Sequence, residues 1–238
     1  MQARNYVLVH GAWHGGWCWR PVAERLRRAG HAVFTPTLTG LGERRHLLHE
    51  GITLDTFVQD VANVIEAEEL TDVYLVGHSF GGRVVCGVAD RMRDSVHRLV
   101  LLDAGLPEPG KAAWDGLPPA VREARVAQAK AAGLRFAMPA PPAEAFGVVE
   151  PQAAAWLARR LTPHPLGAYT SPLRLSNPLG NGLPVTYIRC TAPAYEPIAA
   201  SAEHARVRSD WEYLELATGH DAMVTAPEVL AQMLLALS

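Results

Sequence analysis

The sequence predicts an α/β fold with a mainly parallel sheet flanked by helices, and three observations carry this prediction. Short apolar runs alternate with amphipathic segments, an order that is typical of parallel sheets built from crossover connections. About half of the 238 residues are apolar, which suffices for one substantial core. The alternation stops in the middle of the chain and resumes near its end, which indicates an inserted segment.

The predicted sheet is built from runs on both sides of that segment. Apolar runs bounded by glycine or polar residues predict strands at 6–9, 31–35, 73–76, 98–102, 185–190 and 211–216. Amphipathic patterns predict helices at 19–28, 55–69 and 83–92, and a last helix that begins at Pro227. In the first helix Val22, Ala23 and Leu26 recur at helical spacing, so we expect them to face the core.

The segment 107–184 is predicted to form a helical cap inserted into the core. It is rich in alanine and proline, and its helical patterns cover 121–134 and 151–161. No part of it alternates like a core strand. We therefore assign 1–106 and 185–238 to one core, with the cap inserted between two of its strands.

The pentapeptide G-H-S-F-G that begins at Gly77 is the most informative stretch, because it lies between a predicted strand and a predicted helix. This pattern is typical of a nucleophile elbow, a turn tight enough to strain the serine backbone and to require small flanking residues. Gly77, Gly81 and Gly82 supply them. The sequence therefore predicts that Ser79 is a catalytic nucleophile and not only a helix cap.

A serine hydroxyl is a poor nucleophile at neutral pH and needs a general base. His220 lies in G-H-D-A-M, just beyond the last predicted strand and before the C-terminal helix. In hydrolases with this elbow, the histidine loop follows the last strand. We therefore predict His220 as the base, and we expect His78, inside the elbow, to support the site without transferring the proton.

Two backbone N–H groups are needed to stabilise an oxyanion. One belongs to the residue after the nucleophile, Phe80. The other is expected from the glycine-rich loop 10–17, where Ala12 is best placed. This loop lacks G-x-G-x-x-G spacing, and the next strand ends in Thr35-Pro36 without an acidic residue for a ribose, so a dinucleotide site is not predicted.

Three motifs together resemble the α/β-hydrolase superfamily: V-H-G-A-W-H-G-G-W-C-W, G-H-S-F-G-G and G-H-D-A-M. Within it, the sequence is similar to the branch of small esterases and hydroxynitrile lyases that includes the plant methyl-salicylate esterases. The resemblance covers the core on both sides of the cap. It implies a hydrolase core with a helical cap, no cofactor, and Ser79, His220, Ala12 and Phe80 in the roles already predicted.

The acid of the triad is where the sequence departs from that branch. The branch usually has an aspartate just after the strand 185–190, but proline, Pro193, occupies the expected position. Asp103 ends the strand beside the one that delivers Ser79, and a carboxylate there can reach the histidine. Glu196 lies in the usual loop but about three residues late. We favour Asp103, keep Glu196 as the alternative, and expect Asp221 to point away.

The reaction class follows from which residues are present. Hydroxynitrile lyases of this branch carry a lysine next to the histidine, whereas Asp221 stands here. Epoxide hydrolases and haloalkane dehalogenases need a carboxylate nucleophile, which Ser79 is not. Hydrolysis of an ester through an acyl-enzyme remains. The alternatives are cofactor-free cyclisation or C–C cleavage with the same histidine, and a receptor without turnover, for which Pro193 is the only support.

Aromatic residues from two segments are predicted to line the substrate pocket. Trp13 and His14 come from the glycine-rich loop, and Trp114, Phe136 and Trp156 come from the cap. They favour a small ester with an apolar or aromatic acyl group. The alternative for most of the cap residues is that they pack the cap onto the core.

Charge and hydropathy indicate which partners are not expected. A formal charge of −2 and a pI near 6.5 give no electrostatic footprint for nucleic acid or an anionic membrane, and no apolar run approaches bilayer length. The first strand begins too early to leave room for a signal peptide. We expect a small ester substrate as partner, and a monomer or homodimer in the cytoplasm.

The cysteines and paired histidines do not indicate a metal site or a disulfide framework. Cys18, Cys86 and Cys190 are widely spaced and lie in apolar surroundings. His10 and His14 are four residues apart in a loop, without an evident third ligand. The sequence therefore predicts neither metal nor cofactor, and a reducing compartment.

Overall fold

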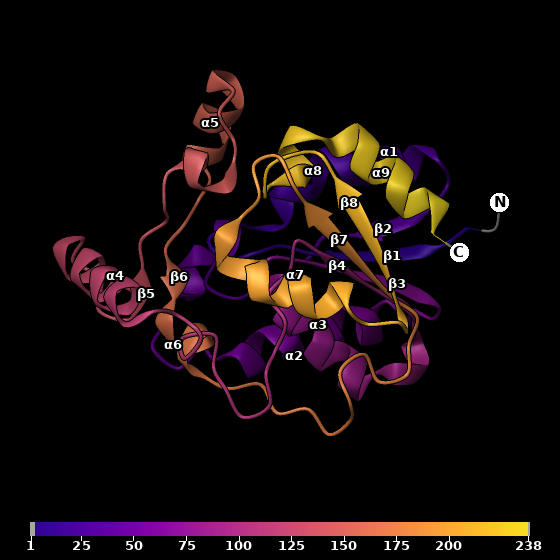
Figure 1. The fold of residues 1–238 in the computed structure, drawn as a ribbon, viewed down its shortest axis with the longest axis horizontal. Helices are drawn as coiled ribbons and strands as arrows, with labels where there is room; N and C mark the ends of the chain where they lie inside the picture. The colour runs from indigo at the N-terminus through magenta and orange to yellow at the C-terminus, as the bar shows by residue number, and fades with distance from the viewer. Residues whose placement is uncertain (1–2, 238) are drawn as a thin grey trace.

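The computed structural model describes residues 3–237, which form a six-stranded sheet covered by helices on both faces (Figure 1). All neighbouring strands are parallel, in the order β2-β1-β3-β4-β7-β8. The strands are β1 (Asn5–Val9), β2 (Ala32–Phe34), β3 (Val73–His78), β4 (Val96–Leu102), β7 (Val185–Cys190) and β8 (Trp211–Leu216). The predicted parallel α/β sheet and its six strands are confirmed.

Each face of the sheet has its own apolar core. On one face α1 (Arg20–Arg28), α8 (Ala222–Thr225) and α9 (Pro227–Ala236) pack together, with Val22, Ala23 and Leu26 of α1 buried as predicted. On the other face lie α2 (Leu54–Ala67), α3 (Gly81–Arg91) and α7 (Ala199–Arg206). Every residue of β3 is buried, because this strand lies in the interior of the sheet between the two helical layers.

The chain between β4 and β7 is helical and irregular, as its sequence predicts. It contains α4 (Pro119–Ala131), α5 (Pro151–Ala158) and α6 (Leu166–Thr170). Two residue pairs, β5 (Ala137–Met138) and β6 (His164–Pro165), form a short antiparallel ladder outside the main sheet. In Figure 1, α4 and α5 stand away from the sheet, on the side where the carboxyl-end loops gather.

Three short helices lie where the sequence predicts none: α6, α7 and α8. Each has eight residues or fewer, so its apolar pattern is too short to show helical periodicity. None of the helices within residues 3–237 is both long and apolar enough to cross a membrane.

Candidate active site

Ser79 lies at the turn between β3 and α3 with a strained backbone. Its φ of 54° falls in the left-handed region, which residues with a Cβ rarely adopt. A Cβ on Gly77 would lie 2.4 Å from Val85 Cγ2, and one on Gly81 would lie 2.6 Å from the carbonyl oxygen of His10. The turn therefore leaves no room for side chains at either flank, as the elbow motif predicts.

Ser79, His220 and Asp103 come together at the carboxyl edge of the sheet, where each follows a strand: β3, β8 and β4. The Ser79 hydroxyl lies 2.8 Å from His220 Nε2. On the other side of the ring, His220 Nδ1–H donates to Asp103 Oδ2 at 2.6 Å. With the proton on Nδ1, the Nε2 lone pair faces the serine hydroxyl and can accept its proton.

The carboxylate of Asp103 is buried and held by more than the histidine. Its second oxygen, Oδ1, accepts hydrogen bonds from the backbone N–H of Cys190 at 3.0 Å and from Arg189 Nη1 at 3.2 Å. These donors fix the carboxylate so that Oδ2 points at the imidazole. Glu196, the alternative acid, is exposed in a single 3₁₀ turn (Glu196–Ile198), and no hydrogen bond joins it to His220 in residues 3–237.

Tyr195 completes the surroundings of the imidazole. Its ring stacks on that of His220 with centroids 3.9 Å apart and planes inclined by 22°. Stacking restricts the rotation of the imidazole about its side-chain bonds. No role for Tyr195 was predicted from the sequence, where the available signal was an aromatic residue in the loop after the strand 185–190.

The backbone N–H groups of Ala12 and Phe80 are available to an oxyanion. Among the described residues, neither donates a hydrogen bond to another group of the chain. The two segments are in close contact, because a Cβ on Gly11 would lie 2.9 Å from Ser79 Cβ. Two buried donors without acceptors beside the nucleophile have the arrangement that stabilises a developing negative charge.

His14, within the glycine-rich loop 10–17, does not line the pocket but forms a buried ion pair with Asp221. Its Nδ1–H donates to the carbonyl of Ala12 at 2.7 Å, and its Nε2–H donates to Asp221 Oδ2 at 2.9 Å. Since both ring nitrogens face acceptors, His14 is an imidazolium. Burial is the largest single influence and opposes the charge, but the charge and hydrogen bond of Asp221, together with the hydrogen bond to Ala12, raise the pKa of His14. Asp221, expected to point away from the triad, does so.

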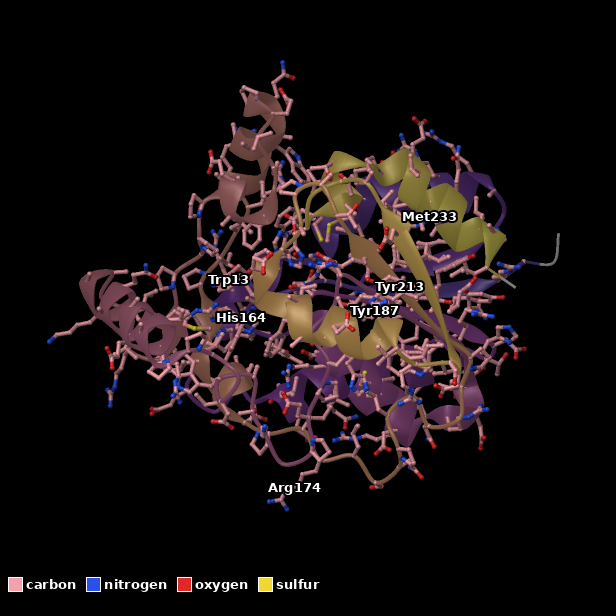
Figure 2. All side chains as sticks on the ribbon, viewed as in Figure 1. Trp13, His164, Arg174, Tyr187, Tyr213 and Met233 are labelled. Carbon is pink, nitrogen blue, oxygen red and sulfur yellow. The ribbon has the colours of Figure 1, made fainter. Side chains whose placement is uncertain are left out.

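Two further histidines connect the loops of the site. His78 Nε2–H donates to the backbone carbonyl of His220 at 3.0 Å, which supports the histidine loop as predicted for this residue. His164, on β6, accepts the backbone N–H of Trp13 at 3.3 Å through Nδ1, so it holds the glycine-rich loop 10–17 from the segment between β4 and β7. Figure 2 shows Trp13 and His164 next to each other near α4. His164 was not predicted from the sequence.

A small cavity of about 90 Å³ opens beside Ser79. Of the five predicted pocket residues, Trp13 lines it, together with residues that the sequence did not indicate as part of the pocket: Phe80, Arg83, Arg125, Tyr169, Tyr195 and Ile198 among them. These residues come from α3, the cap and the loop before α7, so only the tertiary fold brings them together.

The other predicted pocket residues have different contacts. His14 pairs with Asp221, and Trp114 borders a separate hollow against α4. Trp156 packs edge-on against Trp17, with ring centroids 5.1 Å apart. Phe136 lies half-buried before β5, where its carbonyl accepts the N–H of Leu166. Trp114 and Trp156 pack against the core, which is the alternative given for the cap residues.

Comparison with protein families gives one match that spans nearly the whole chain. The profile of the α/β hydrolase family matches residues 6–233. A carbendazim hydrolyzing esterase of Nocardioides sp. is 44% identical over 243 aligned positions, which cover 98% of this chain and 99% of that protein. Methylesterase 10 of Arabidopsis thaliana is 34% identical over 107 positions, 44% of this chain and 39% of that protein.

Solved structures give the same fold over the full length. An extracellular α/β-hydrolase from a Paenibacillus species, described as sharing structural and functional homology with tobacco salicylic acid binding protein 2, superposes with a TM-score of 0.82. It is 24% identical and the match covers 98% of each chain. The methylesterase MES16 from Arabidopsis superposes with a TM-score of 0.74 at 22% identity, covering 98% of each chain.

Proposed function

We propose that this chain, which belongs to the α/β-hydrolase family and is a carboxylic ester hydrolase, cleaves its ester through an acyl-enzyme on Ser79. The family and the esterase activity predicted from the sequence motifs are confirmed by the relatives. The roles of individual residues are our proposal. The observation that carries it is the continuous hydrogen-bonded row from Ser79 through His220 to Asp103.

In the proposed first step, Ser79 Oγ attacks the ester carbonyl carbon while His220 Nε2 takes the serine proton. Asp103 stabilises the imidazolium that forms and holds the proton on Nδ1. The imidazolium then gives its proton to the oxygen of the leaving alcohol, and the acyl group stays on Ser79. Water, activated by the same histidine, attacks the acyl-enzyme and releases the acid.

The negative charge of the tetrahedral intermediate is proposed to lie between the N–H groups of Ala12 and Phe80. Both are fixed by the fold before substrate binds: Phe80 precedes α3, and His164 and His14 both hold the peptide group that joins Ala12 to Trp13. Removing one such donor typically costs about 3 kcal/mol of transition-state stabilisation.

For the substrate we propose a small ester with an apolar or aromatic part, because aromatic rings of Trp13, Phe80, Tyr169 and Tyr195 line the cavity. At about 90 Å³ the cavity is well below the size of sites for drug-sized ligands, so a larger ester requires the cap to move. Carbendazim is a substrate to test directly, because it is named in the relative at 44% identity.

A covalent probe separates this proposal from non-catalytic alternatives. We expect a fluorophosphonate to label the protein at Ser79, and p-nitrophenyl acetate to be turned over. Ser201 is the matched control, because it lines the same cavity but its Oγ accepts the backbone N–H of Leu106 at 3.0 Å and contacts no histidine of residues 3–237. Labelling should persist in S201A and disappear in S79A; a label on Ser201, or none at all, contradicts the proposal.

We also propose that 107–184 acts as the cap of this site, that the protein is cytoplasmic, and that it is a monomer or homodimer. Arg125 and Tyr169 of this segment line the cavity, which supports its role as a cap. Cys18, Cys86 and Cys190 are free and buried, which supports a reducing compartment. Light scattering coupled to gel filtration measures the oligomeric state.

A further inference from the structure

The cavity beside Ser79 contains two guanidinium groups and no carboxylate. Arg83 and Arg125 both line it, and none of the lining residues is acidic. Over the whole sequence acidic residues slightly outnumber basic ones, 24 to 22, so this local excess of positive charge does not follow from composition. An electropositive lining favours a ligand with negative charge.

Arg83 is the more unusual of the two, because it lies on the first turn of α3 and its side chain has no hydrogen-bond or ion-pair partner among residues 3–237. Its Nη1 is buried without a hydrogen-bond partner, whereas its backbone N–H donates to the carbonyl of Phe80 at 3.1 Å. Burial lowers the pKa of its guanidinium. A buried charge is unfavourable unless a charged or polar group pairs with it, so the folded protein alone leaves Arg83 incompletely satisfied.

Arg125 approaches the same cavity from α4 of the cap. Its guanidinium lies over the rings of Trp13 and Tyr169, at 5.7 and 5.2 Å from their centroids, and contacts the sulfur of Met138 at 3.8 Å. Stacking orients the guanidinium plane, but it leaves the N–H donors of Arg125 available to bind an anion. Among the described residues Arg125 has no carboxylate partner.

Glu108 interacts electrostatically with Arg83, but its carboxylate is already paired with Lys111. Its carboxylate accepts a hydrogen bond from Lys111 Nζ at 2.8 Å, and both side chains are exposed. Within residues 3–237 no ion pair joins Glu108 to Arg83. Arg83 therefore lines the cavity without being paired to a carboxylate of the described residues.

We infer that the ester cleaved at Ser79 carries a carboxylate, which Arg83 binds with Arg125 beside it: the substrate class is half-esters of short dicarboxylic acids. This inference rests on the proposed function. Arg83 lies on the first turn of α3, four residues after Ser79, and the cavity holds about 90 Å³, so the ester and the carboxylate are separated by a short chain. The aromatic rings contact that chain, and the guanidinium groups bind its charged end.

The kinetic test compares monomethyl succinate with methyl 4-methylpentanoate, in which an isopropyl group replaces the carboxylate at similar size. We expect the wild type to favour the anionic ester in kcat/KM. R83M should lower the ratio of the two kcat/KM values by about 10- to 100-fold, the usual effect of losing a hydrogen bond to a charged group. R83K, which keeps the charge but not the planar fork, should lose less.

R91M is the matched control, because Arg91 lies at the exposed end of the same helix and pairs with Asp55 away from the cavity. It removes one positive charge and should leave the ratio unchanged. A wild type that cleaves the neutral ester as well as the anionic one, or an R91M variant that loses the preference as R83M does, overturns the inference.

A binding measurement keeps this inference separate from the catalytic proposal. Calorimetric titration of monomethyl succinate into S79A should show binding that R83M in the S79A background abolishes. If wild type is labelled at Ser79 by a fluorophosphonate but S79A binds the half-ester no better than S79A/R83M, the anion site is refuted and the esterase mechanism stands. If Ser79 is not labelled while binding depends on Arg83, the anion site stands and the mechanism is refuted.

Discussion

Among residues 3–237, two buried histidine–aspartate pairs of the same site are joined by hydrogen bonds, and they differ in what the second ring nitrogen contacts. His220 donates to Asp103 and presents Nε2 to the hydroxyl of Ser79, which can give up a proton. His14 donates to Asp221 and presents Nδ1 to the carbonyl of Ala12, which can only accept one. The first pair can therefore exchange protons with a reactant, whereas the second is a fixed charge.

This difference shows that a carboxylate beside a histidine does not by itself make a general base. The lone pair of the imidazole must face a group with a transferable proton. In the second pair, His14 Nδ1 faces the carbonyl of Ala12, which has no proton to give. The charged His14 therefore holds the glycine-rich loop in place and takes no part in proton transfer. One pair is proposed to act in turnover, and the other to hold the glycine-rich loop against the histidine loop.

The largest expected effect follows from changing the first pair. Asp103→Asn should reduce kcat by about 10⁴-fold, because an amide favours the wrong tautomer of the histidine. Glu196→Gln is the control, since Glu196 is exposed, and it should change kcat by less than about twofold, as surface changes usually do. Steady-state hydrolysis of p-nitrophenyl acetate measures both. The reverse ranking would transfer the role of the acid to Glu196.

Breaking the second pair should reduce stability more than chemistry. His14→Gln or Asp221→Asn leaves one buried charge without its partner, which typically costs about 3–5 kcal/mol of unfolding free energy. Urea denaturation measures this loss. The double variant H14Q/D221N should recover part of it, because no uncompensated charge remains. If each single variant is as stable as wild type, His14 and Asp221 do not form a charged pair in the folded protein.

The sequence was sufficient for the groups whose roles follow from local motifs. Ser79 lies in a pentapeptide that requires the turn, and His220 lies in the loop that the last strand delivers, so both positions follow from chain order. Asp103 could be proposed because the carboxyl ends of parallel strands meet at one edge of the sheet. The six strands could be predicted from local pattern, because a buried parallel strand is a continuous apolar run in the sequence.

The cavity could not be predicted in the same way. Tyr169 and Tyr195 reach it from two segments whose relative placement depends on tertiary packing and not on periodicity. Trp13 and Trp156 have the same side chain, yet Trp13 lines the cavity and Trp156 packs on Trp17. Arg83 is visible in the sequence as a charged residue next to apolar ones, on the first turn after the elbow. A solvent-exposed position would explain this pattern equally well.

A smaller loss of stability is expected from changing His78, which contacts the backbone carbonyl of His220 and lies near Asp221. His78→Phe removes the hydrogen bond to the carbonyl of His220 while keeping a ring of similar size, and leaving that carbonyl unsatisfied should cost about 1–3 kcal/mol of stability. His78→Gln retains a donor and should lose less. Urea denaturation measures both; equal losses would show that packing, and not this hydrogen bond, is what His78 contributes.

The pH dependence of stability separates the charged histidine from its neutral neighbours. The raised pKa of His14 means that its contribution is complete below the unfolded value of about 6.5 and is lost as pH rises through the folded pKa. Burial lowers the pKa of His10 to about 3 and also lowers those of His78 and His164, so their contributions are lost as pH falls below about 6.5. Wild-type stability should therefore decline on both sides of neutrality.

His14→Gln should remove only the loss of stability that wild type shows as pH rises above neutrality. The stability difference between wild type and H14Q is expected to be constant between pH 5 and 6, and to shrink at higher pH by at most about 1.4 kcal/mol per pH unit, the limit for one proton. Urea denaturation between pH 5 and 9 measures it, with H46Q as control because His46 is exposed on the loop before α2. A difference that grows with pH would mean that His14 is neutral when folded, and the contrast between the two pairs would then be lost.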